Sequence, residues 1–240
     1  MMSRLKALLN IGLYFFIVLF ITMLITIIML GNGSSMTEIE DFVYSITTYG
    51  AMMLGALLVI CLINWRYLKQ KLAYGLNHFK ETLGYGCLGY LATLGILTIY
   101  GFIKVLVLGR NGIVDSENEA AIEMMSAQAN FVVLFLTMVV ITPFLEEIVF
   151  RVSLLGLLIK DQKSKKYYCY ILAAIIFALL HGVDFIFNFN AANVMNFIEY
   201  LLLSGALVFV YYKSNHNLLA VYLLHACNNL TALITLVLFS

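Results

Sequence analysis

Charged residues and prolines are scarce in this sequence of 240 residues. Only 11% of the residues are charged, against about 25% in ordinary soluble domains, and Pro143 is the one proline. In contrast, 63% of the residues are hydrophobic, with 17 Phe and 15 Tyr among them. The low charge excludes a water-soluble domain, and the apolar runs with few helix breakers predict a bundle of membrane helices.

The sequence also lacks a dominant charge and a paired set of cysteines. The formal net charge is +1, so no overall basic field exists that would hold a nucleic acid. The four cysteines are scattered through apolar runs without the close spacing of a zinc-binding or disulfide framework. We interpret them as small apolar residues of the membrane region. Membrane lipids are therefore expected as partners, and nucleic acids are not.

Seven apolar segments qualify as spans of a bilayer, for which about 20 residues are needed, although some carry polar interruptions. They lie near residues 7–30, 42–64, 83–108, 130–159, 167–181, 194–212 and 217–239. The first follows Arg4 and Lys6 and is too long for the core of a signal peptide, so we expect it to be retained as an anchor. The predicted fold class is all-α, a polytopic transmembrane bundle of about seven spans.

The distribution of basic residues predicts the orientation, because cytoplasmic loops concentrate Lys and Arg. If the N-terminus is cytoplasmic, Lys104 and Arg110 are the only basic residues on the outer side. We treat residues 1–240 as a single integral-membrane domain. Within it, residues 1–127 would form three spans plus a surface segment, for which 113–128 is the polar candidate. Residues 128–240 would form the motif-bearing catalytic core.

Few ionisable residues remain at membrane depth once the loops are set aside. They are Glu146, Glu147, Arg151, His181, Glu199 and His225. Each charge near the middle of a span costs about 2.5–3.5 kcal/mol on insertion scales, so each requires a partner or a function. We expect Glu199 to lie near the outer end of its span and to reach only the interface. Pro143, one turn before the two glutamates, would bend its helix or free a backbone carbonyl.

Helical spacing assigns directions to the first group of charges. Glu147 and Arg151 are four residues apart, so they can form an ion pair on one face of a helix. Glu146 projects about 100° away from that face. One carboxylate is therefore expected to be structural, and the other is expected to be available for chemistry.

Two later helices place polar side chains at a similar depth. Counted from the cytoplasmic ends of their helices, Glu146, His181 and His225 lie about 14–22 Å into the membrane. Asn229 follows His225 by one turn. Glu146 with His181 would take a proton from water, while His225 and Asn229 would donate to the developing negative charge. This is the outline of a peptide hydrolase.

Three motifs carry these residues in a fixed order. They are Glu146-Glu147-x-x-x-Arg151, Phe177-x-x-x-His181 and His225-x-x-x-Asn229. Over residues 130–238 the chain resembles the CPBP family of intramembrane proteases, which includes the type II CAAX prenyl endopeptidases and bacterial Abi-type proteins. The resemblance implies endoproteolysis of a membrane-associated peptide or protein, with the roles given above for the carboxylate, the imidazoles and the amide. Glu147 and Arg151 complete the first motif in a supporting role.

The resemblance also bears on substrate and location. Seven spans differ from the eight of eukaryotic CAAX proteases, and a short chain of this composition resembles the bacterial branch, which is associated with peptide processing, bacteriocin self-immunity and signalling. We therefore expect a multi-pass protein of the bacterial cell membrane with a membrane-associated peptide or protein as substrate. Two other functions stay open, a non-catalytic scaffold or bacteriocin self-immunity protein, and a proton-coupled transporter.

The sequence leaves the cofactor open. Zinc is possible, with Glu146, His181 and His225 as ligands and a water in the fourth position, and a metal-free mechanism is equally possible. Single ligands on three helices do not decide between the two. The chain has no His-Glu-x-x-His, Gly-x-Gly-Asp or Gly-x-Ser-x-Gly motif, which excludes the site-2, presenilin-like and serine-elbow proteases.

Overall fold

The computed structural model describes residues 2–31, 38–109, 130–159 and 166–239. Every regular element in these ranges is a helix, so the predicted all-α fold class is confirmed. Within these ranges, five helices are long and apolar enough to cross a membrane, and Tyr167–His181 is a shorter apolar helix. The polar segment predicted at 113–128 lies outside the described residues. The number of spans and the orientation stay predictions.

Helices occupy all of the predicted spans. Outside the central segment they are α1 (Arg4–Gly31), α2 (Glu38–Asn77), α3 (Phe79–Leu108), α8 (Lys166–His181), α9 (Asp184–Phe187), α10 (Ala191–Lys213) and α11 (Leu218–Phe239). The α2 helix continues well beyond its predicted span, which ends at residue 64. The reason is that residues 65–77 include Lys, Leu, Gln and Arg, which form helix readily although they are not all apolar.

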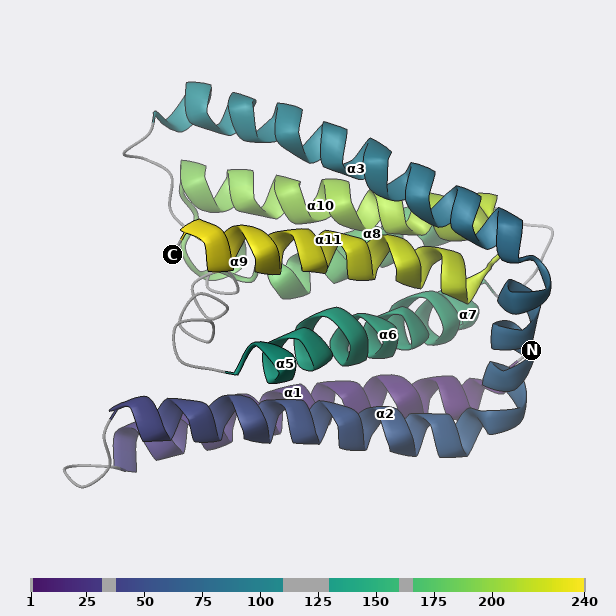
Figure 1. Ribbon diagram of the computed structural model, residues 1–240, viewed down its shortest axis with the longest axis horizontal. Helices are drawn as coiled ribbons and strands as arrows, with labels where there is room; N and C mark the ends of the chain where they lie inside the picture. Colours follow the sequence, from purple (N-terminus) through teal and green to yellow (C-terminus); the bar gives the residue numbers. More distant parts are fainter. Residues whose placement is uncertain (1, 32–37, 110–129, 160–165, 240) are drawn as a thin grey trace.

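One helical segment, Phe131–Leu158, runs between the other helices (Figure 1). We call it the motif helix, and it consists of α5 (Phe131–Leu134), η2 (Phe135–Ile141), α6 (Thr142–Glu146), η3 (Glu147–Leu154) and α7 (Leu155–Leu158). On one side it contacts α1 and α2, and on the other it contacts α11. Residues 147–153 of this helix are all buried. Its charged side chains therefore lie inside the protein and do not face lipid.

Pro143 lies between two π-helical stretches of the motif helix, η2 and η3. At the end of η2 the amide of Thr142 donates to the carbonyl of Thr137, five residues earlier. The same pattern one residue later would pair the carbonyl of Met138 with the nitrogen of Pro143, which carries no hydrogen. Pro143 thus leaves the Met138 carbonyl to another donor, which is one of the two effects predicted for it. Single π-turns in helices are frequent at functional sites.

The α3 and α11 helices approach each other closely at Gly86. A Cβ atom at this position would lie 2.7 Å from Cδ2 of Leu223 and 3.1 Å from the carbonyl oxygen of Ala220. Only glycine fits this contact without a shift of α11. Because α11 also packs against the motif helix, the contact helps to fix the distance between the polar residues of the two helices.

Candidate active site

Glu147 and Arg151 form a completely buried ion pair on the motif helix. Oε2 of Glu147 and Nε of Arg151 are 3.1 Å apart, and neither side chain has exposed surface. The i, i+4 pair predicted from the sequence is confirmed. The guanidinium group also lies over the ring of Phe177, 5.0 Å from its centroid. Pairing offsets part of the cost of burying two charges in this region.

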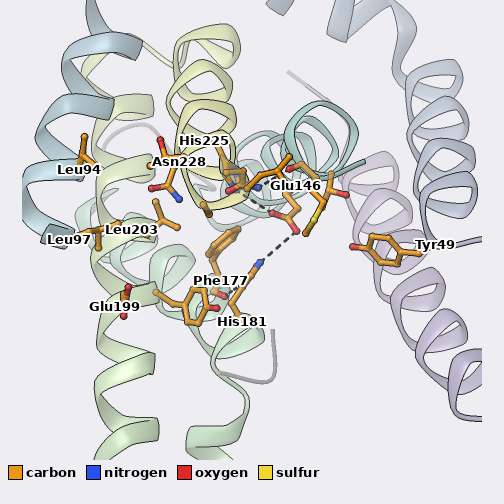
Figure 2. A pocket seen from close by; sticks show the side chains of 17 residues that line it. Tyr49, Leu94, Leu97, Glu146, Phe177, His181, Glu199, Leu203, His225 and Asn228 are labelled. Carbon is orange, nitrogen blue, oxygen red and sulfur yellow. Dashed lines mark hydrogen bonds and ion pairs between the residues drawn. The ribbon is translucent and has the colours of Figure 1, made fainter. Parts of the chain in front are cut away.

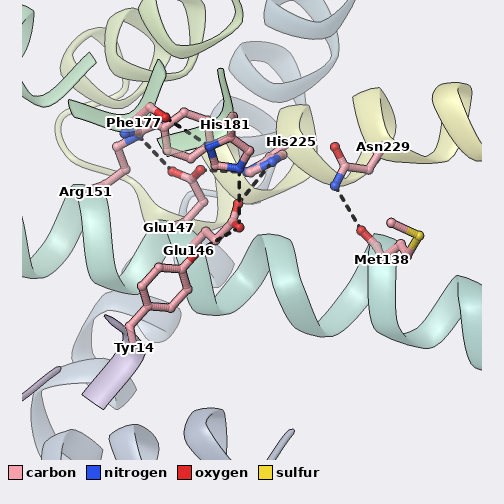
Figure 3. Close-up of polar contacts among 9 residues, drawn as sticks. All are labelled: Tyr14, Met138, Glu146, Glu147, Arg151, Phe177, His181, His225 and Asn229. Carbon is pink, nitrogen blue, oxygen red and sulfur yellow. Dashed lines mark hydrogen bonds and ion pairs between the residues drawn. The ribbon is translucent and has the colours of Figure 1, made fainter. Parts of the chain in front are cut away.

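Glu147 has a second partner on α11. Its Oε1 atom is 2.8 Å from Nδ1 of His225, whose side chain is also buried. The two oxygens of Glu147 therefore contact Arg151 and His225, one each (Figure 3). This carboxylate orients other side chains, and it is not part of the wall of the cavity described below.

Glu146 points in a different direction and approaches both imidazoles. Its Oε1 is 3.6 Å from Nε2 of His181, and its Oε2 is 3.7 Å from Nε2 of His225. The hydroxyl of Tyr14, on α1, donates to Oε1 at 3.1 Å. The structure thus brings together a carboxylate and two imidazoles from the motif helix, α8 and α11 (Figure 3). Separations just beyond hydrogen-bond length suit a water that contacts both groups.

His181 is held in one orientation by its own helix. Its Nδ1 is 3.0 Å from the backbone carbonyl of Phe177, and its ring stacks on the Phe177 ring with centroids 4.1 Å apart. Because a carbonyl can only accept, Nδ1 carries the hydrogen. In the neutral ring, the lone pair on Nε2 then faces Glu146, where it can take a proton.

Asn229 is fixed by the carbonyl that Pro143 leaves free. Its Nδ2 donates to the backbone oxygen of Met138 at 2.9 Å. An amide nitrogen has two hydrogens, so one N–H is left for a second acceptor. The structure places Asn229 on the same helix as His225 but gives it no direct contact with Glu146, and Figure 3 shows it offset from the cluster toward Met138.

These side chains line a cavity of about 310 Å³ inside the bundle (Figure 2). Its wall includes the candidate residues Glu146, His181, His225 and Asn229. Leucines of α3, α10 and α11 contribute apolar surface, among them Leu94, Leu97, Leu203 and Leu233. A largely apolar cavity with a few converging polar groups is the usual form of a ligand site.

Comparison with known proteins gives a match over the part of the chain that builds this site. Residues 128–231 match the family described as type II CAAX prenyl endopeptidase Rce1-like. We call residues 128–231 the Rce1-like segment, after the family that they match. The resemblance predicted from the three motifs is confirmed, and at the family level it supports a CAAX-protease-like intramembrane endopeptidase that acts on membrane-associated substrates. No curated protein and no solved structure matches the chain.

The Rce1-like segment also contributes Glu199 to the cavity wall. We expected this residue near the outer end of its span. Its Oε2 is 3.0 Å from Nζ of Lys104 on α3, and the Lys104 side chain is 10% exposed. Position along a helix predicts the depth of a charge, but it does not predict a partner 95 residues away.

The side chains predicted as possible zinc ligands lie close together. Among the residues that the structure describes, no three His, Cys, Asp or Glu side chains are grouped to hold a metal ion. The Nε2 atoms of His181 and His225 instead approach the two oxygens of Glu146. The chemistry proposed below is derived for the side chains alone.

Tyr14 contacts Glu146 from outside the Rce1-like segment, and the sequence did not predict this contact. The sequence nevertheless contains a pattern that points to this contact. Asn10 and Tyr14 are four residues apart in an otherwise apolar run, so they share one face of α1. Asn10 donates to the hydroxyl of Ser153 on the motif helix at 2.9 Å, which shows that this face of α1 packs on the motif helix.

Proposed function

We propose that this protein is an intramembrane endopeptidase that hydrolyses a peptide bond of a membrane-associated peptide or protein. The observation that carries the proposal is the meeting of Glu146, His181 and His225, from three helices, at the wall of one cavity. Carboxylate and imidazole groups in a mostly apolar cavity are suited to general acid–base chemistry.

Glu146 and His181 would activate the water. Nε2 of His181 and Oε1 of Glu146 face each other, and both are acceptors. The reason is that the hydrogen of the neutral His181 ring is on Nδ1, which donates to the carbonyl of Phe177. A water between them donates one hydrogen to each. When its oxygen attacks the scissile carbonyl carbon, the proton passes to Nε2 of His181, and the charge of Glu146 balances the imidazolium that forms. The same proton then goes to the leaving amine as the C–N bond breaks.

His225 and Asn229 would stabilise the oxyanion of the tetrahedral intermediate. Glu147 accepts from Nδ1 of His225, which leaves Nε2 on the cavity side, 3.7 Å from Oε2 of Glu146. The imidazolium form of this ring would present an N–H there. The free N–H of Asn229 adds a second donor on the same helix. Donors held in place before the reaction stabilise charge without reorganising, which is the largest contribution in many acyl-transfer enzymes.

The surroundings of the site favour a membrane-bound substrate. Apolar leucines form much of the cavity wall, and five of the described helices can cross a membrane. We place the protein in the cell membrane with a cytoplasmic N-terminus, as the basic residues predict. Whether its product serves peptide maturation, immunity or signalling depends on the substrate.

The membrane peptides of cells test the proposed function directly. Cells that carry Glu146→Gln at normal abundance are expected to accumulate an uncleaved membrane peptide or protein that wild-type cells process. Glu81→Gln, at an exposed position near the start of α3, is the matched control and should leave the peptides unchanged. Identical peptide sets in Glu146→Gln and wild-type cells would favour the alternative function, a non-catalytic scaffold or self-immunity protein.

Asn229→Ala is expected to lower kcat by about 10²–10³-fold while substrate binding changes little, because one oxyanion donor is lost. Steady-state cleavage of the substrate identified above measures both quantities. Asn77→Ala, at the exposed end of α2, provides a control for loss of an amide elsewhere. An Asn229→Ala enzyme with unchanged kcat would remove this residue from the mechanism.

A further inference from the structure

Tyr14 is held rigidly against the motif helix. Its side chain is 7% exposed, and its ring meets the ring of Phe150 edge-on, with centroids 5.6 Å apart and an interplanar angle of 82°. Its hydroxyl donates to Oε1 of Glu146 at 3.1 Å. The ring contacts fix the position of the hydroxyl, and the hydroxyl in turn fixes the position of Oε1 of Glu146.

A second polar contact fixes the position of α1 one turn away. Asn10 donates to Ser153 at 2.9 Å and accepts from Asn64 of α2 at 2.8 Å, and all three residues are buried. The hydroxyl of Ser153 in turn donates to the carbonyl of Ile148. This chain of hydrogen bonds joins α1, α2 and η3. Tyr14 therefore reaches Glu146 from a helix that cannot shift along the motif helix without breaking them.

The contact with Tyr14 is the shortest of the side-chain contacts found for Glu146. The two imidazole nitrogens are 3.6 and 3.7 Å from the carboxylate, against 3.1 Å for the tyrosine hydroxyl. Without this donor, the carboxylate is free to rotate away from α1 and to occupy the space where a water contacts both Glu146 and His181. Small displacements of a reacting group slow a reaction strongly, since the geometry of attack is lost.

We propose that Tyr14 is a positioning residue that holds Glu146 apart from His181 and His225, so that the first helix contributes to the polar site of these three residues. Tyr14 acts through Glu146 and needs no contact with the substrate. The proposal rests on the proposed endopeptidase function.

Tyr14→Phe tests this role, because phenylalanine keeps the ring contacts and removes only the hydroxyl. With wild-type and variant proteins purified in the same detergent, kcat is expected to fall about tenfold and KM to stay within about twofold. The melting temperature reports whether the fold is kept. Tyr100→Phe is the matched control, since Tyr100 is a buried tyrosine whose hydroxyl donates to the carbonyl of Met195, away from Glu146. It should leave kcat unchanged.

Glu146→Gln, measured in the same assay, distinguishes a failure of the positioning role of Tyr14 from a failure of the proposed endopeptidase function. If Glu146→Gln is inactive and Tyr14→Phe keeps the wild-type kcat, the positioning role of Tyr14 is wrong and the proposed function stands. If Glu146→Gln is fully active, the proposed function itself fails. If the kcat of Tyr14→Phe and that of Tyr100→Phe fall equally per folded molecule, the effect is structural and the proposal is also overturned.

Discussion

Replacing His181 with alanine is expected to slow cleavage of the membrane substrate by about 10²–10⁴-fold, because the reaction loses the group that takes the proton from water. The carbonyl of Phe177 and the stacked ring hold this imidazole with Nε2 toward Glu146. The initial rate of product formation by purified protein in proteoliposomes measures the effect.

His78 provides the control for this variant. His78 is exposed next to the start of α3, and its ring stacks on the ring of Tyr74 in the preceding turn. His78→Ala should therefore cleave at the wild-type rate. A His181→Ala protein that is folded and retains most of its activity would contradict the assignment of the base.

Arg151→Met is expected to have the largest effect on stability, a loss of about 3–5 kcal/mol in the free energy of unfolding. The substitution leaves Oε2 of Glu147 without its charged partner in a site without exposed surface, and it also removes the guanidinium from the ring of Phe177. Denaturant unfolding in mixed micelles measures the difference. Arg66→Met, at an exposed position of α2, is the control and should change stability little.

A double substitution separates the structural role of this pair from its role in catalysis. Glu147→Leu with Arg151→Met removes both charges and should recover much of the lost stability, since a buried pair can often be replaced by apolar residues. The double variant should nevertheless stay inactive, because His225 loses the partner at its Nδ1. Full activity in the double variant would show that Glu147 does not orient His225.

Much of this fold could be predicted from the sequence because its signals are local. Apolar runs long enough for a membrane mark the helices, and the spacing of Glu147 and Arg151 gives their ion pair. The order of the three motifs gives the family resemblance, which the match over residues 128–231 confirms. Each of these inferences depends on residues that are neighbours on one helix, or on the order of motifs along the chain.

The remaining parts of the site depend on contacts between distant segments. Tyr14 and Glu146 are 132 residues apart, so no spacing rule connects them. The contact of Asn229 with Met138 requires the π-helical turn before Pro143, whereas the sequence predicts an ordinary helix with a kink or a free carbonyl. Counting along straight helices also placed His225 less deep than His181, although both approach Glu146.

The most direct test of the account is the rate at which purified protein in proteoliposomes cleaves its membrane substrate when Glu146 is glutamine. Glutamine keeps the size of the side chain and its contact with Tyr14, but it cannot balance the charge of a protonated His181. The account predicts that wild-type protein and Glu81→Gln cleave one peptide bond at equal rates, while folded Glu146→Gln gives no measurable product. Cleavage by Glu146→Gln at the wild-type rate would contradict it.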